Sequence, residues 1–417
     1  MEDVSELALR LFHVLLTLVC LAAGVAPAAA TIFTMQRGLN LDPWVTWPPP
    51  ERWDDEDVIG NFPEWRRNIR TEDLEAIRNA GFDFVRMPVD PAIFLENASE
   101  QRVARLVAET LKSINMLQKA GLKVIVDLHS LPSDQRKIGT HQILADPLLF
   151  ARYLDLVGRL GRAVAITDPA LTAFEPFNEP VLDCDLPVHP KWPPLLWRLH
   201  AAARQALPRH TLLLSGGCWA SAYGLSQINP TAVADDNVIW TFHSYEPFIL
   251  THQGAGWTGD VMAYVEGLPY PPERLGAAAL QEIIEHTRQR ISGGAPESDR
   301  KALLDNFNEM VAGVTTDAKA LAVLNGPFEE AAVWGRQYSI PPERIFLGEF
   351  GMIRQAYGTD FRVPSPWRAS YLKDMVATAR WHGFPWSVWS WEGSFGVTLA
   401  DDRSVFDPVI LNGLTSE

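Results

Sequence analysis

The chain of 417 residues has only three cysteines and no excess of positive charge, and both shortages narrow what it can do. Its 36 Lys and Arg residues are outnumbered by 51 Asp and Glu residues, which gives a formal net charge of −15 at pH 7. Such a surface repels nucleic acids and anionic membranes, so neither is expected as the main partner. No G-x-G-x-x-G or Walker A loop leads from a predicted strand into a helix, so no nucleotide cofactor is expected.

The chain also lacks a linker rich in Pro, Ser and Thr, an internal repeat and a tandem binding module. With 47% hydrophobic and 21% charged residues it is neither collagen-like nor wholly disordered. Its length suits two average domains or one large α/β barrel. We expect one catalytic domain over residues 31–417 and a monomeric protein.

The N-terminal residues 1–30 have the pattern of a targeting segment. An apolar run at 11–26 is followed by Pro27 and three alanines, which is typical of a signal peptide. Its front end departs from that pattern, because three acidic residues outnumber Arg10 where positive charge is normal. We therefore expect a signal peptide, with an uncleaved N-terminal anchor as the alternative, and a secreted or periplasmic protein.

Cys20 lies inside this apolar run, so Cys184 and Cys218 are the two cysteines of the remaining chain. In an oxidising compartment they are able to pair. Two buried free thiols fit the sequence equally well, and spacing alone does not decide between the two.

From residue 31 onward, short apolar runs rich in β-formers alternate with amphipathic helical patterns. Eight runs alternating with helices predict a (β/α)8 TIM barrel. The predicted strands are Phe33–Arg37, Phe82–Pro88, Leu122–Leu128, Leu171–Asn178, Thr211–Ser215, Val238–His243, Ile345–Glu349 and Trp386–Trp391.

Two connections are longer than a minimal barrel needs. Residues 246–344, between the sixth and seventh strands, hold two helical patterns beyond the one the barrel requires, Pro272–Ile291 and Lys301–Val314. We interpret them as an inserted helical lid or wall. Residues 41–70 include an acidic run at 54–57, which lacks the ligand spacing and turn glycine of a calcium loop and is expected to be solvated.

Tryptophan is abundant, with 15 copies, and flat indole rings suit the binding of sugar rings. Several of these tryptophans lie in the long connections, where they either extend a binding groove or pack the loops. They are Trp44, Trp47, Trp53 and Trp257, and Trp65 also lies in the connection 41–70.

Polar side chains follow the predicted strands at the point where each strand ends. Because the carboxyl ends of barrel strands meet at one mouth, these side chains are expected to lie together. Two glutamates among Arg, His, Asn and Tyr are what retaining glycoside hydrolysis requires, with the two carboxyl groups about 5 Å apart. The residues concerned are Arg86, Asp127, His129, Asn178, Glu179, His243, Tyr245, Glu349, Trp389 and Trp391.

Each group then has an expected role. One carboxyl must stay protonated, so burial and the second carboxylate should raise its pKa. The nucleophile must stay ionised, which Arg86 and a hydrogen bond from Tyr245 favour. Asn178 is expected to bind the sugar 2-hydroxyl and Trp389 to stack under the sugar ring at the cleaved bond.

Other residues of the same pattern have simpler interpretations. Glu175 shares a strand face with Glu179 but lies deeper, so we expect it in a buried ion pair or hydrogen bond. His129 and His243 are two metal-ligand types without a third at a recognisable spacing, so we expect hydrogen-bonding roles and no metal. Asp127 is expected to shape its strand end.

The combination of motifs resembles the clan A, family 5 glycoside hydrolases, the cellulase-type barrels. NEP alone is a weak signal, but NEP with a downstream GEFG and an intervening HxY, each at a strand end, is specific. The resemblance implies that Glu179 is the acid/base and Glu349 the nucleophile, with Arg86, His129, Asn178, His243, Tyr245 and Trp389 around them. The matching segments are RGLN (37–40), Arg86, DLH (127–129), FNEP (177–180), HSY (243–245), GEFG (348–351) and SVWSWEG (387–393).

We therefore expect a cofactor-free, retaining endo-type β-glycosidase acting on soluble β-glucans or their oligosaccharides. Alternatives on the same barrel are an exo-acting β-glucosidase or β-1,3-glucanase, a mannanase and a transglycosylase; the 246–344 insertion would favour exo action if it closed one end of the groove. A non-catalytic carbohydrate-binding barrel and a metal-assisted hydrolase using His129, His243 and a carboxylate are the rivals from other classes.

Overall fold

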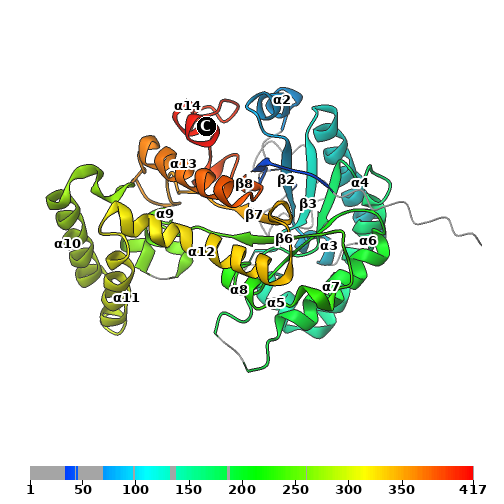
Figure 1. Ribbon diagram of the computed structural model, residues 1–417, viewed down its shortest axis with the longest axis horizontal. Helices are drawn as coiled ribbons and strands as arrows, with labels where there is room; N and C mark the ends of the chain where they lie inside the picture. Colours follow the sequence, from blue (N-terminus) through cyan, green and yellow to red (C-terminus); the bar gives the residue numbers. More distant parts are fainter. Residues whose placement is uncertain are drawn as a thin grey trace, which may run out of the picture.

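A closed barrel of eight parallel strands forms the centre of the protein (Figure 1). The computed structural model describes residues 33–42, 44–45, 69–96, 99–131, 138–185, 188–259 and 261–416. The strands follow one another in sequence order and β8 pairs with β1, which confirms the predicted (β/α)8 barrel. They are β1 (Arg37–Asn40), β2 (Phe84–Val89), β3 (Lys123–Leu128), β4 (Thr172–Glu175), β5 (Leu212–Ser215), β6 (Val238–His243), β7 (Ile345–Glu349) and β8 (Trp386–Val388).

Helices surround the barrel, each burying one face against the strands or a neighbouring helix. In α6, Asp146 caps the first turn and Pro147 begins the helix, while Phe150, Val157 and Val164 lie on the buried face. The longer described helices are α2 (Thr71–Asn79), α4 (Glu100–Lys119), α6 (Pro147–Val164), α7 (Trp192–Ala206), α10 (Ala277–Gly294), α11 (Arg300–Ala312), α12 (Asp317–Tyr338), α13 (Ser365–His382) and α14 (Pro408–Thr415). The shorter ones are α3 (Ala92–Leu95), α5 (Thr140–Ala145), α8 (Ala222–Ser226) and α9 (Phe248–Thr251).

The first strand was predicted at Phe33–Arg37, and this prediction is wrong by about one strand length. Strand β1 begins at Arg37, where the earlier run ends. Phe33 and Met35 are buried among the side chains that fill the lower end of the barrel, and the Phe33 N–H donates to Thr211 Oγ1. The alternating pattern therefore belongs to an extended segment that closes the bottom of the barrel and is not a barrel strand.

The interior of the barrel changes character along its axis. Its lower part is a separate apolar cluster that includes Phe84, Ile125 and Phe346. Two residues further along the same three strands, on the same inward face, stand Arg86, Asp127 and Gly348. The strands thus turn from apolar to polar as they approach the mouth.

The predicted insertion between β6 and β7 is present as helices. Helix α12 covers the barrel, whereas α10 and α11 pack against each other and against the short 3-10 turns η4 (Val261–Tyr264) and η5 (Pro272–Leu275). In Figure 1 these two helices stand at the edge of the molecule, away from the barrel strands.

Several sequence predictions lie outside the described residues, namely segment 1–30, the acidic run 54–57, and Trp47, Trp53 and Trp65. Trp44 is buried, so it packs its loop rather than extending a groove. Among the helices within the described ranges, none is long and apolar enough to span a bilayer.

Candidate active site

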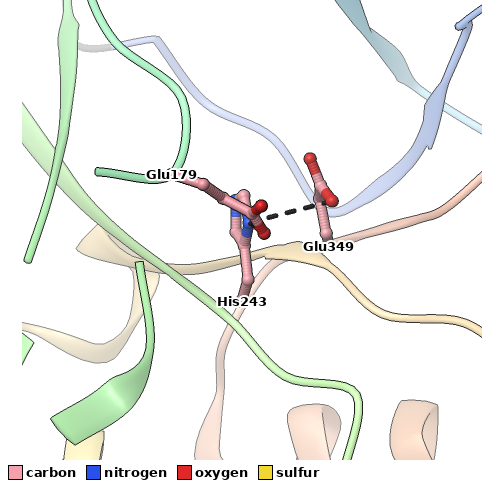
Figure 2. Close-up of side chains that lie close together, drawn as sticks. All are labelled: Glu179, His243 and Glu349. Atoms are coloured by element: carbon pink, nitrogen blue, oxygen red, sulfur yellow. Dashed lines mark hydrogen bonds and ion pairs between the residues drawn. The ribbon is translucent and has the colours of Figure 1, made fainter. Parts of the chain in front are cut away.

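Glu179 and Glu349, which follow β4 and end β7, meet at the mouth of the barrel. One carboxylate oxygen of each, together with a ring nitrogen of His243, lie within 4.8 Å of one another. Figure 2 shows the two glutamates reaching toward each other, with the His243 ring beside the Glu179 carboxyl group. This spacing matches that of retaining glycosidases and is shorter than the separation of about 6.5–9.5 Å in inverting enzymes.

Both oxygens of Glu349 accept hydrogen bonds, one from a buried and one from a partly buried donor. Arg86 Nη1 donates to Oε1 at 2.7 Å, and Tyr245 Oη donates to Oε2 at 2.9 Å. The Glu349 side chain is 5% exposed, so these two donors replace most of its water. A carboxyl group held between a guanidinium and a phenol has a fixed orientation.

Gly348 allows Glu349 to reach this position. The register of β6 and β7 shifts there, so that His243 pairs with Glu349 and Gly348 is passed over. A Cβ atom on Gly348 would lie 2.6 Å from Thr241 Oγ1 and 2.8 Å from His243 Nε2, which is too close for any side chain. The glycine is therefore required by close packing at the mouth.

Arg86 is fully buried and connects several acidic groups. Its guanidinium makes a bidentate ion pair with Glu175, through Nε at 2.7 Å and Nη2 at 3.1 Å, which places Glu175 in the predicted buried ion pair. Asp127 Oδ2 lies 3.0 Å from Arg86 Nη2. Burial raises the pKa of Asp127 to about 7 and that of Glu175 above its ordinary value, although Arg86 opposes both shifts.

Glu179 has a different environment from Glu349. Its side chain is 21% exposed, and its Oε1 lies 2.8 Å from His243 Nδ1. Burial raises the pKa of Glu179 to about 8, because the opposing charge of Arg86 is partly offset by Asp127 and Glu175. Burial also lowers the pKa of His243 to about 4, so the imidazole is neutral near pH 7. At neutral pH Glu179 is thus largely a carboxylic acid.

His129 and Asn178 line the floor between these groups. His129 Nδ1 lies 2.7 Å from Asp127 Oδ2, and its Nε2 lies 3.0 Å from Asn178 Nδ2. Asn178 Oδ1 accepts from Arg86 Nη2 at 2.8 Å. The half-buried indole of Trp389, which follows β8, stacks on the His129 ring with centroids 5.3 Å apart.

Asn40 also belongs to this network, although no role of its own was predicted for it from the sequence. Its Oδ1 accepts from Arg86 Nη1 at 3.0 Å, and its Nδ2 donates to the Gly348 carbonyl at 3.0 Å. The strand-end pattern would have found Asn40, because it is the last residue of β1. The misplaced first strand left Asn40 three residues beyond the predicted strand end.

Cys184 and Cys218 form a disulfide, which decides the alternative that the sequence left open. The bond joins the loops after β4 and β5 beside Glu179.

Trp219, the residue after Cys218, is 42% exposed, and its N–H donates to the Pro180 carbonyl at 2.8 Å. Cys218, Trp219 and Ala220 all have positive φ, between 48° and 60°, a conformation that non-glycine residues rarely adopt in succession. Trp219 could not be predicted from the sequence, because the exposure of a single indole leaves no local sequence signal.

Glu179, His243 and Glu349 are also close enough to share a cation, but their contacts fit one poorly. Both Glu349 oxygens already accept hydrogen bonds, and Arg86 places a positive charge beside them. The metal-site alternative combined His129 with His243, whereas His129 contacts Asp127 and Asn178. The site is better described as a proton-transfer and ion-pair network.

Comparisons with known proteins agree with this geometry. The family model Cellulase (glycosyl hydrolase family 5) matches residues 55–394. Endoglucanase C of Acetivibrio thermocellus (strain ATCC 27405) is 30% identical over 258 residues, which cover 61% of this chain and 69% of that protein. Endoglucanase 3 of Fibrobacter succinogenes is 21% identical over 375 residues, covering 87% of this chain and 50% of that protein.

Solved structures resemble the chain over nearly its whole length. An endoglucanase superposes with a TM-score of 0.65 at 18% identity, covering 92% of this chain and 97% of that one. Thermotoga maritima Cel5A in complex with cellobiose gives a TM-score of 0.58 at 21% identity, covering 91% and 97%. These likenesses establish the shared barrel, and the family match spans most of the sequence. The chain therefore belongs to glycosyl hydrolase family 5, the cellulase family, and is a glycoside hydrolase acting on O-glycosyl compounds.

Proposed function

We propose that the protein is a retaining endo-β-1,4-glucanase in which Glu349 is the nucleophile and Glu179 the acid/base. The observation that carries the proposal is the pairing of two carboxyl groups within 4.8 Å in contrasting environments. Glu349 is held by Arg86 and Tyr245 as an acceptor, whereas burial keeps Glu179 protonated near neutral pH. Two carboxyl groups set apart in this way supply the two roles of the double-displacement mechanism.

In the first step a Glu349 carboxylate oxygen attacks the anomeric carbon of the sugar. Glu179 gives its proton to the glycosidic oxygen as the carbon–oxygen bond breaks, so the leaving sugar departs as a neutral alcohol. The neutral His243 donates from Nδ1 to Glu179 Oε1, which leaves the second oxygen to carry the transferred proton. A covalent glycosyl–Glu349 ester results.

In the second step Glu179, now a carboxylate, takes a proton from water. The resulting hydroxide equivalent attacks the anomeric carbon and breaks the ester bond to Glu349, so the product keeps the original configuration. Glu179 is thereby protonated again. Arg86 and Tyr245 stabilise the negative charge that returns to Glu349 as the ester breaks.

The surrounding residues hold the sugar ring that is attacked. Trp389 is fixed by stacking on His129 and presents an indole at the mouth, where it supports the ring. Asn178 uses its carbonyl oxygen for Arg86 and one amide hydrogen for His129, so its second amide hydrogen is available for the sugar 2-hydroxyl.

A β-1,4-glucan is the proposed substrate because relatives that match more than half of this chain are named endoglucanases. The range of names justifies testing others: another relative is a probable glucan 1,3-beta-glucosidase of Emericella nidulans, 26% identical over 261 residues. Thermotoga maritima Cel5A has been solved with mannotriose. Endo action would show as a rapid loss of viscosity with few new reducing ends, whereas early release of only short products would indicate exo action.

The deciding experiment measures hydrolysis of carboxymethyl-cellulose, barley β-glucan, laminarin, mannan and p-nitrophenyl-β-glucoside. Wild type is expected to cleave the first two best. Glu179→Gln and Glu349→Gln are each expected to lose at least about a thousandfold in kcat/KM, which is about 4 kcal/mol of barrier. Full activity in either variant would reject that residue's assignment, and no cleavage by wild type would favour a binding barrel.

Two controls separate the remaining chemical alternatives. Incubation with EDTA is expected to leave activity unchanged, and a loss restored by added metal would favour metal-assisted hydrolysis. Product analysis at high substrate concentration would show elongated oligosaccharides if a sugar hydroxyl replaced water in the second step.

We also infer that the protein works outside the cytoplasm. The disulfide between Cys184 and Cys218 supports this, because such bonds persist in oxidising compartments. The apolar N-terminal run described above is the matching sequence signal. Expression of the full chain followed by N-terminal sequencing of the exported protein would test both.

A further inference from the structure

Two aromatic side chains from different loops meet at the surface on the mouth side of the barrel. Trp257, in the 3-10 turn η3 (Gly256–Thr258) after β6, is 50% exposed, and Tyr357, in the loop after β7, is 76% exposed. Their ring centroids lie 5.7 Å apart with an interplanar angle of 53°. Rings of this size are usually buried, so a contacting, exposed pair indicates a binding surface rather than core packing.

The loops that carry this pair are firmly held. Arg354 donates from Nη1 to the Thr398 carbonyl and from Nη2 to the Gly393 carbonyl, each at 2.9 Å. These bonds fix the Tyr357 loop to the segment after β8. The Ile353 N–H donates to the Thr251 carbonyl at 2.9 Å, which connects the same loop to the segment that leads to Trp257. The two rings are therefore presented in a defined position, as a ligand platform requires.

The pair is continuous with the active site through the β8 loop. A Cβ atom on Gly393 would lie 3.5 Å from Tyr357 Oη, so the phenol lies over that residue. Gly393 follows Trp389 by four residues, so their Cα atoms are at most about 15 Å apart. In the closed barrel β8 stands opposite β4, so the segment after β8 that Tyr357 overlies lies across the mouth from Glu179, which follows β4. Trp257, which follows β6, packs against Tyr357 there.

We propose that Trp257 and Tyr357 form a distal sugar-binding platform that stacks on a ring of the substrate chain beyond the one supported by Trp389. The inference rests on the proposed glucanase function. It adds to that function the protein residues that bind the glycone end of long substrates. The occupant is the glucan that runs into the active site, because the platform adjoins the loop bearing Trp389 and no charged side chain is needed to bind a neutral sugar face. The platform would make the enzyme prefer long chains to short ones.

The test compares two aryl glycosides that differ only on the glycone side, p-nitrophenyl cellobioside and p-nitrophenyl cellopentaoside. Replacing Trp257 and Tyr357 by Ala is expected to lower kcat/KM for the long substrate by about tenfold per ring removed and to leave the short one within about twofold. Trp257→Phe and Tyr357→Phe keep an aromatic face and are expected to retain most of the activity on the long substrate.

Trp381→Ala is the matched control, because Trp381 is 85% exposed on α13 and lies outside the mouth loops. This variant should leave kcat/KM unchanged for both substrates. The platform is rejected if the Trp257→Ala/Tyr357→Ala double variant cleaves both substrates like wild type. It is also rejected if kcat/KM falls by the same factor for both substrates, which would indicate a structural role. Failure of wild type to cleave any glucan would instead reject the proposed function, and the platform with it.

Discussion

The lower and upper parts of the barrel interior are made by the same strands and differ by two residues of sequence. On β2, β3 and β7 the lower layer presents Phe84, Ile125 and Phe346, all fully buried. The layer above presents Arg86 and Asp127, which lie in a network with Glu349. One part is an ordinary apolar core, and the other is a fully buried set of charges.

The two parts contribute to the protein in opposite ways. Burial of the lower aromatic and aliphatic side chains stabilises the fold. Burial of the upper groups costs desolvation energy, as the pKa of Asp127 near 7 and that of Glu179 near 8 show. The site therefore tolerates an energetic penalty in order to hold one carboxyl as an acceptor and the other as an acid. Substitutions in the two layers should separate stability from chemistry.

Arg86→Met should have the largest effect, because it removes a cation that Glu175, Asp127 and Glu349 share. Leaving buried charges without their partner typically costs about 3–5 kcal/mol of the free energy of unfolding. Activity should also fall at least about a hundredfold, since Glu349 loses its donor on Oε1. Denaturant unfolding and kcat/KM measure the two losses.

The double variant Arg86→Met/Glu175→Gln sharpens this result. Neutralising Glu175 removes one uncompensated charge and should recover part of the stability without restoring activity. If Arg86→Met alone unfolded at the wild-type denaturant concentration, the buried ion pairs would not be contributing as described.

Phe346→Ala tests the lower layer. Truncating this fully buried ring should cost about 3–5 kcal/mol of unfolding free energy through lost burial and a cavity. The folded fraction should keep kcat/KM within about threefold of wild type, because Glu349, on the same strand, retains its donors. A large loss of activity per folded molecule would mean that the two layers are not independent.

Removing the disulfide should affect the upper loops less severely. Cys184→Ser with Cys218→Ser removes a cross-link between residues that are 34 positions apart in the sequence. The loss of loop-closure entropy predicts a decrease of about 3–4 kcal/mol in the free energy of unfolding, and strain often makes the measured decrease smaller. Thermal unfolding of the variant, and of wild type with and without reductant, measures the effect. An unchanged midpoint in both would indicate that the bond does not constrain the loops.

The smallest expected effect is a gradual change of activity and stability with pH. Activity should fall above about pH 8, because Glu179 must be protonated and its pKa is about 8. The folded-state pKa of Glu179 lies above its ordinary value of 4.5, so the contribution of Glu179 to stability is complete below about pH 4.5 and is lost as the pH rises toward 8.

Glu179→Gln should remove this dependence of stability, and unfolding midpoints of both proteins from pH 4 to pH 9 would show it. An activity optimum that stays flat to pH 10 would contradict a titrating Glu179.

Much of this architecture was predictable from local patterns. Alternating strand and helix signals predicted the barrel, and polar residues placed directly after apolar strands predicted that Glu179 and Glu349 would share one mouth. The first strand was misplaced because an extended apolar segment looks the same whether it pairs within a barrel or closes its lower end. That error is the reason Asn40 received no role.

The sequence by itself determined which chemical groups stand at the strand ends, because strand periodicity and the parallel barrel fix their face and their edge. Only the tertiary structure decided their states and their partners. Arg86 lies between three carboxylates, Cys184 meets Cys218, and Trp257 meets Tyr357, across separations of tens to hundreds of residues. Burial and pKa depend on all the groups that surround a side chain in space, and loops distant in sequence contribute most of those groups.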